Sequence, residues 1–129
     1  MMNNISFTDL EAYFPQICDW AQQQEQFIIR HGVPLSPDQQ IDAYQIGVQQ
    51  IKQVRLLKVD QMPSAPLDAS RKHLLASLPL LSSSTIGLTF RYGIYIRADH
   101  WGRRSLVIHE LVHTRQYEQL GGFSSFLKQ

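Results

Sequence analysis

The most constraining feature of this sequence is the stretch 105–120, which runs without glycine or proline up to Gly121-Gly122. Such a run followed by a glycine pair is typical of a helix and its C-terminal stop. Residues three and four apart share a helix face, so His109, His113 and Gln116 form one polar stripe. Val107, Ile108, Leu111 and Val112 cover most of the remaining circumference, and we expect the helix to be buried on most sides.

The stripe contains an H-E-x-x-H pattern. Histidines four apart on a helix present two imidazoles to one point, as a zinc ion requires. Glu110 is rotated about 100° from His109, where it can accept a proton from water without ligating the metal. In this pattern the glutamate is the usual general base of a metalloprotease. Three fixed residues can also arise by chance, but Leu111 and Val112 between the histidines are apolar, unlike a solvated face.

The stretch resembles the H-E-x-x-H region of the zincin metallopeptidases, in particular the gluzincins. It is still more similar to a group of small bacterial zinc-dependent peptidases with the pattern H-E-L-V-H-x-x-Q-Y-x-x-L-G, matched by residues 109–121. Those proteins tend to carry G-x-P-L, G-V and V-R-L-L upstream, and this chain has them at 32–35, 47–48 and 54–57. The resemblance extends from about residue 32 to residue 127. It departs at Arg115, where zincins have a hydrophobic residue.

The resemblance implies a zinc-dependent peptidase with His109 and His113 as metal ligands and Glu110 as the catalytic base. It implies a small sheet whose edge strand borders the active-site cleft and pairs with an extended peptide or protein substrate. Gln116 is expected to form a second-shell hydrogen bond. His100 or Tyr117 is the candidate donor to the developing oxyanion, although packing against the sheet is the alternative role for Tyr117.

The sequence does not place a third zinc ligand, although catalytic zinc sites usually have three. Glu118 is the only acidic residue after His113 and points away from the histidines, so we interpret it as a surface carboxylate. His100 and Asp99 precede the helix and are the upstream candidates. Either the chain is truncated at its C-terminus, or the zinc site is incomplete, weak or empty. The alternative function is a catalytically inactive zincin-like module that binds a protein or peptide.

Local patterns predict the remaining elements. The first is a helix capped by Ser6 or Thr8 that ends at His31 and is kinked or restarted at Pro15. The others are helices at 36–47 and 68–78, a strand at 53–59, and a β region at 85–97. This last region is either a hairpin turning at Arg91-Tyr92-Gly93 or one strand with a bulge at Gly93. We expect an α+β fold with N-terminal helices, a small sheet and the zincin-like helix packed on that sheet.

Length and composition limit the other possibilities. A chain of 129 residues that is 43% hydrophobic predicts one domain with a true core. The net charge of +1, without a basic patch, argues against nucleic acid as a partner. No apolar run is long enough to span a bilayer, and no signal peptide is recognisable. The single Cys18 excludes an internal disulfide and fits a reducing compartment, so we expect a cytoplasmic protein. The oligomeric state is left open.

Overall fold

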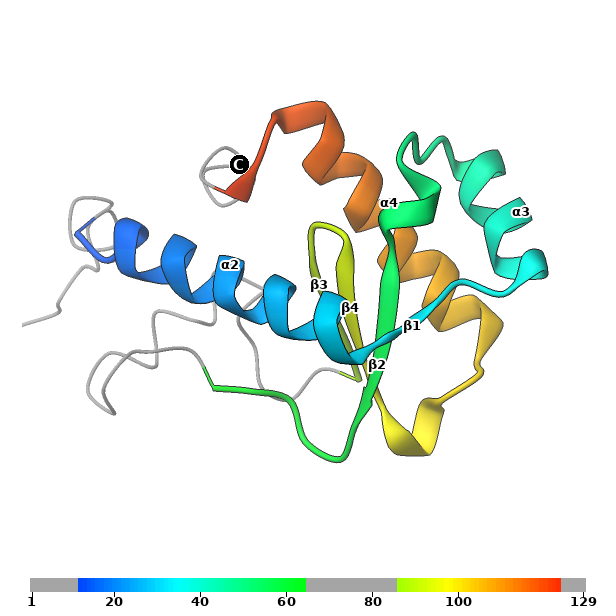
Figure 1. Cartoon of the computed structure of the whole chain (residues 1–129), viewed down its shortest axis with the longest axis horizontal. Helices are drawn as coiled ribbons and strands as arrows, with labels where there is room; N and C mark the ends of the chain where they lie inside the picture. The colour runs from blue at the N-terminus through cyan, green and yellow to red at the C-terminus, as the bar shows by residue number, and fades with distance from the viewer. Residues whose placement is uncertain (1–11, 65–85, 124–129) are drawn as a thin grey trace, which may run out of the picture.

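The computed structural model describes residues 12–64 and 86–123, which form helices around a small sheet (Figure 1). The helices are α2 (Phe14–His31), α3 (Pro37–Ile46) and α4 (Arg104–Leu120), with 3-10 turns η1 (Ile51–Gln53) and η4 (Ala98–His100). The strands are β1 (Val33–Pro34), β2 (Arg55–Val59), β3 (Gly87–Phe90) and β4 (Gly93–Arg97). The predicted α+β fold is confirmed, while the predicted helix at 68–78 lies outside the described residues. Within the described ranges, no helix is sufficiently long and apolar to cross a membrane.

The helix boundaries follow local sequence signals. Ser36 caps α3 by accepting a hydrogen bond from the Gln39 main-chain N–H, and the Gln39 side chain accepts one from Ser36 in return. The same helix ends at Gly47, whose φ of 104° is in the left-handed region that glycine tolerates. Pro15 lies in the first turn of α2, so it starts that helix and does not kink it.

The sheet has the order β1-β2-β4-β3 and is mixed. Strand β2 runs parallel to β4, whereas the β1–β2 and β3–β4 pairs are antiparallel. Residues 85–97 therefore contain a hairpin over their described part, and the alternative of one long bulged strand is wrong. Phe90 pairs with Gly93, which leaves Arg91 and Tyr92 as a two-residue turn. Strand β3 is the outer strand on this side of the described sheet.

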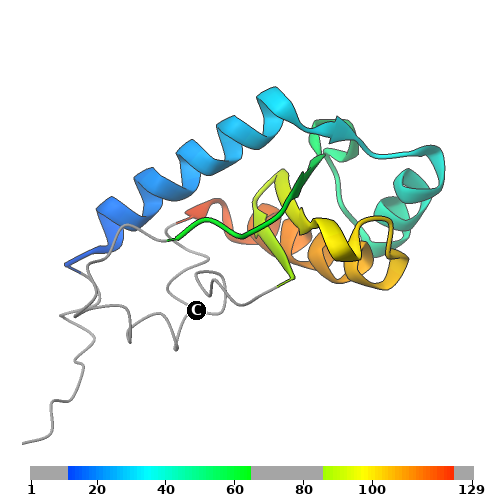
Figure 2. The ribbon, with the colours of Figure 1, turned by 90° about the horizontal axis from the view of Figure 1, so that it is seen from below.

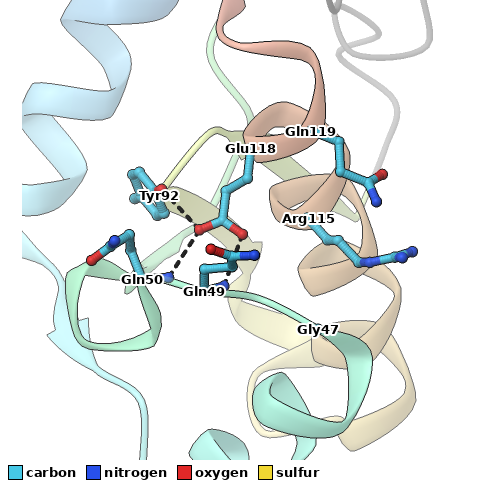
Figure 3. Close-up of a pocket in the computed structure, with 7 residues that line it drawn as sticks. All are labelled: Gly47, Gln49, Gln50, Tyr92, Arg115, Glu118 and Gln119. Carbon is cyan, nitrogen blue, oxygen red and sulfur yellow. Dashed lines mark hydrogen bonds between the residues drawn. The ribbon is translucent and has the colours of Figure 1, made fainter.

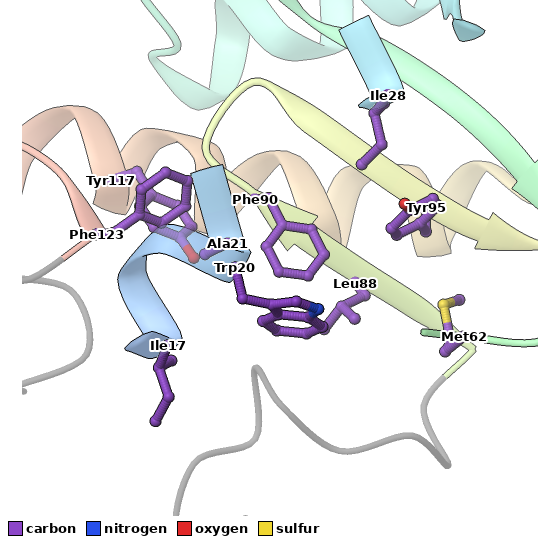
Figure 4. Packing of buried hydrophobic residues seen from close by; sticks show 10 residues of the cluster. All are labelled: Ile17, Trp20, Ala21, Ile28, Met62, Leu88, Phe90, Tyr95, Tyr117 and Phe123. Carbon is purple, nitrogen blue, oxygen red and sulfur yellow. The ribbon is translucent and has the colours of Figure 1, made fainter. Parts of the chain in front are cut away.

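Helices cover both faces of the sheet, with α2 on one side and α4 on the other (Figure 2). Because side chains alternate along a strand, Leu88 and Phe90 of β3 point toward α2. There they join one core cluster with residues of α2 and the C-terminal part of α4 (Figure 4). The other two residues of β3, Gly87 and Thr89, point to the opposite face of the sheet, toward α4. Strand β3 therefore brings two small residues to the surface on which the H-E-x-x-H helix packs.

A buried carboxylate fixes the β3–β4 turn. Glu25 of α2 is 3% exposed and accepts two hydrogen bonds from the Arg91 guanidinium, at 2.9 and 2.8 Å. It also accepts one from the Tyr92 main-chain N–H at 3.1 Å. Arg91 has a φ of 57°, an unusual value for a residue with a side chain, so these bonds stabilise a strained turn. Thr114 of α4 donates to the Arg91 carbonyl at 2.7 Å, which ties the turn to the second helix.

Candidate metal-binding and catalytic site

Helix α4 buries one face, and the expectation that it is buried on most sides is wrong. Its buried residues are Leu106, Val107, Glu110, Leu111, Thr114 and Tyr117. Val112 is 37% exposed and Ile108 is half-buried, because α4 packs mainly against strand β3 and helix α3 among the described elements. The polar stripe lies at the border of the buried face, where His109 is exposed and His113 is half-buried. A solvent-facing border of this kind is accessible to ligands.

The two histidines of the motif lie next to each other. Their ring centroids are 5.1 Å apart, with an interplanar angle of 84°. Zinc–nitrogen bonds of about 2.0–2.1 Å and tetrahedral angles would place two ligating imidazoles with centroids roughly 5 Å apart. The separation of His109 and His113 therefore fits two nitrogen ligands of one zinc ion.

Gln116 lies where the sequence places it, beside His113. Its Oε1 is 2.9 Å from His113 Nδ1. A carbonyl oxygen can only accept, so in this arrangement Nδ1 is the donor, and the neutral tautomer with this bond has its lone pair on Nε2. A hydrogen bond to the non-ligating ring nitrogen is the usual way in which proteins orient a metal-binding histidine. Gln116 is thus suited to orient His113 as a metal ligand, which is the role predicted for it.

Glu110 is the buried member of the motif, with 4% of its surface exposed. The Thr89 hydroxyl of β3 donates to Glu110 Oε1 at 2.6 Å. Burial raises the pKa of the Glu110 carboxyl, while the Thr89 hydrogen bond and the nearby His113 and His109 lower it in part. No Arg or Lys forms an ion pair with Glu110 within the described ranges. A buried carboxyl without a cationic side-chain partner is characteristic of functional sites.

The two candidate oxyanion donors have other partners among the described residues. Tyr117 is 1% exposed, and its hydroxyl donates to the Thr89 carbonyl at 3.2 Å. Its ring packs against Phe123, and burial raises its pKa well above the usual value. Tyr117 therefore has the packing role that was the alternative. His100 lies in η4, with Nδ1 2.7 Å from the Arg103 guanidinium and Nε2 3.8 Å from the Asp99 carboxylate.

The structure does not supply the third ligand from its described residues, among which no group of three or more His, Cys, Asp or Glu side chains could hold a metal ion. Asp99 forms an ion pair with Arg97 at 2.8 Å. His100 and Asp99 are therefore not brought to the pair of His109 and His113. The two histidines and Glu110 fit part of a zinc site, and their assigned roles stay predictions.

Glu118 is only half-buried, near the end of α4, and its carboxylate also makes structural contacts that the sequence did not predict. It accepts hydrogen bonds from the main-chain N–H groups of Gln49 and Gln50, both at 2.9 Å, and from the Tyr92 hydroxyl at 2.9 Å (Figure 3). Burial and this last bond raise the pKa of Tyr92 to about 12. Glu118 thus joins α4 to the segment after α3, at the wall of a polar pocket of about 420 Å³. Arg115 lines the same pocket and extends away from Glu118.

Sequence reasoning missed Thr89 and Gly87, the two β3 residues that contact Glu110. The alternation of apolar residues in β3 could have placed both on one face of the strand. It could not have shown that this face meets Glu110, because that contact spans more than twenty residues of sequence. No family model matches the chain, and no curated protein or solved structure matches it either.

Proposed function

We propose that this chain is a zinc-dependent peptidase, in which His109 and His113 hold zinc and Glu110 is the general base. The observation that carries the proposal is the position of the Glu110 carboxylate. It is buried between α4 and the outer strand β3, next to two neighbouring imidazoles, and no Arg or Lys among the described residues forms an ion pair with it. Burying an unpaired carboxylate costs stability, which favours a functional reason for its presence.

Each residue has a separate task in this mechanism. A bound zinc ion supplies Lewis acidity that polarises the scissile carbonyl. Glu110 accepts a proton from the attacking water, and Gln116 holds His113 in the tautomer whose Nε2 can bind the metal. The substrate is an extended peptide or protein segment that lies along β3. A third protein ligand would come from residues outside the described ranges or from a partner.

Metal content and peptidase activity of the purified full chain test the proposal. After zinc supplementation and removal of free metal, we expect zinc in the wild-type protein and cleavage of an unfolded protein such as casein. His113→Ala removes one of the two assigned ligands, so zinc content and activity should both be lost. Glu110→Gln should keep the zinc and lose the activity.

His31→Ala is a matched control for the loss of an imidazole. His31 lies at the end of α2 and stacks on Phe27, with ring centroids 4.5 Å apart. This variant should keep both zinc and activity. Equal zinc content in wild type and His113→Ala, or a wild type that takes up no zinc, would disprove the proposed metal site.

The second candidate is a catalytically inactive zincin-like module that binds a protein or peptide. The hydrogen bond between Thr89 and Glu110 Oε1 favours it, because that oxygen is already occupied. The lack of a third ligand among residues 12–64 and 86–123 points the same way. In this case the folded wild type would retain an unfolded peptide on a column and never cleave it, with or without zinc.

A further inference from the structure

Thr89 holds one oxygen of the Glu110 carboxylate. Its hydroxyl is 2.6 Å from Glu110 Oε1, a short distance typical of hydrogen bonds to a carboxylate, and 3.2 Å from the Glu110 carbonyl. Thr89 is 1% exposed, so water does not compete for this contact. The branched Cβ of threonine restricts its rotation. The direction of the hydroxyl is therefore set by the strand, and the Glu110 side chain is oriented by it.

Gly87 makes room for the other oxygen. A Cβ atom added at this position would lie 2.8 Å from Glu110 Oε2 and 3.0 Å from both Glu110 Cδ and Leu106 Cδ1. The backbone of Gly87 is not in the left-handed region, so alanine would be tolerated by the main chain itself. Glycine at this position thus has a steric explanation, because the Glu110 carboxylate occupies the space that a larger side chain would need.

The main chain of β3 is itself held in place beside these two residues. The Tyr117 hydroxyl, about two turns along α4 from Glu110, donates to the Thr89 carbonyl at 3.2 Å. Helix α4 therefore contacts Thr89 at three atoms: the carboxylate and the carbonyl of Glu110, and the Tyr117 hydroxyl. These contacts fix the distance between the helix and the strand at the level of the carboxylate.

We infer that Thr89 and Gly87 are positioning residues for the general base, an inference that rests on the proposed function. Thr89 fixes Oε1 as a hydrogen-bond acceptor, and Gly87 leaves Oε2 as the oxygen that receives the proton from water. The arrangement explains how one oxygen of Glu110 is occupied while the carboxylate still serves as a base. It assigns to β3 a role in orienting the base as well as in binding the peptide.

Three variants of the full chain test this inference by steady-state kinetics and zinc content. Thr89→Val removes the hydroxyl and keeps the branched shape, whereas Thr89→Ser keeps the hydroxyl. Gly87→Ala pushes the carboxylate out of its place. We expect Thr89→Val and Gly87→Ala to lower kcat about tenfold or more with KM and zinc content unchanged. Thr89→Ser should keep most of the wild-type kcat.

Gly93→Ala is the matched glycine control. A Cβ there would lie 2.9 Å from Ile28 Cβ, on the α2 side of the sheet. This variant should lower the melting temperature and leave kcat of the folded protein unchanged. Equal kcat for Thr89→Ser and Thr89→Val, or an equal loss of kcat in Gly93→Ala and Gly87→Ala, would overturn the inference.

A double-mutant cycle in urea unfolding tests the contact without any assay of activity. Thr89→Val and Glu110→Ala should be non-additive, because each removes one partner of the same hydrogen bond. Additive effects would overturn the inference even if the wild type were an active peptidase. A wild type without zinc and without activity would instead refute the proposed function, and non-additivity would still show that Thr89 holds Glu110.

Discussion

Glu25 and Glu110 are the two buried glutamates among the described residues, at 3% and 4% exposure, and their surroundings differ completely. Glu25 receives both arms of the Arg91 guanidinium and a main-chain N–H. Glu110 receives one hydroxyl, from Thr89, and lies next to two imidazoles. One carboxylate is matched by a permanent cation and joins α2 to a hairpin turn. The other has no such cation among residues 12–64 and 86–123 and belongs to the H-E-x-x-H motif.

The difference shows how burial can serve stability or chemistry. A buried carboxylate that accepts two hydrogen bonds from one arginine has its charge neutralised and most of its lone pairs filled, so it is held in a single orientation. A carboxylate with one neutral donor keeps lone pairs that can accept a proton. The raised pKa of Glu110, caused mainly by burial, makes it a stronger proton acceptor than an exposed glutamate. The following predictions, from the largest effect to the smallest, test this distinction.

Glu110→Gln should give the largest effect. In the zinc-loaded protein we expect kcat to fall roughly a hundred- to ten-thousand-fold, because glutamine keeps the shape but cannot accept the proton. Zinc content, measured by metal analysis, and the circular dichroism spectrum should match the wild type. Full activity with zinc bound would show that Glu110 is not the base.

Glu25→Gln, the same substitution at the other site, should act on stability. It removes the charge that faces Arg91, and we expect the free energy of unfolding to fall by about 2 kcal/mol. The loss is moderated because the Arg91 side chain is 43% exposed and can turn to water. Urea unfolding measures it, and kcat of the folded fraction should stay unchanged. A loss of kcat with no loss of stability would reverse the roles that we assign to the two glutamates.

Asp42 extends the comparison to a third buried carboxylate, and its effect should be smaller. The Arg104 guanidinium binds it at 3.0 and 2.9 Å and lowers its pKa below the ordinary 3.8. The resulting stability is complete above the ordinary value and is lost as the pH falls through the lowered one. Because Arg104 is 76% exposed, Asp42→Asn should cost less than Glu25→Gln.

The measurement is the difference in urea midpoint between wild type and Asp42→Asn over the acidic range. That difference should be largest near neutral pH and should shrink as the medium is acidified. A difference that grows on acidification would contradict the assigned direction of the pKa shift.

The smallest effect should be that of Glu110→Gln on stability. The substitution removes a charge that burial disfavours and keeps an oxygen that can accept the Thr89 hydrogen bond. We therefore expect the free energy of unfolding to change by no more than about 0.5 kcal/mol, or to rise slightly. A loss as large as that of Glu25→Gln would mean that Glu110 is a structural residue as well.

Local sequence signals predicted most of the described helices and strands, but not the short strand β1 or the 3-10 turns η1 and η4. The Ser36 cap, the left-handed Gly47 and Gly121, the α4 helix and the turn at Arg91 each depend on residues within a few positions of one another. Their free energies are set by backbone geometry and short-range hydrogen bonds, which a sequence pattern reflects directly. The side-by-side placement of His109 and His113 belongs to the same class, because helix geometry alone brings them together.

Only the tertiary structure determined which side chains of these elements contact one another. A helical wheel gives the angles between side chains but not which angle faces the sheet, so the exposure of Val112 was not predicted. The contacts of Glu25 with Arg91, of Glu118 with the segment after α3, and of Thr89 with Glu110 join residues 66, 68 or 69, and 21 positions apart. Such pairs leave no periodic signal, since only the packing of α2, β3 and α4 against one another brings them within hydrogen-bonding distance. The position of the Glu110 carboxylate against Thr89 and Gly87 is accordingly determined by the tertiary structure.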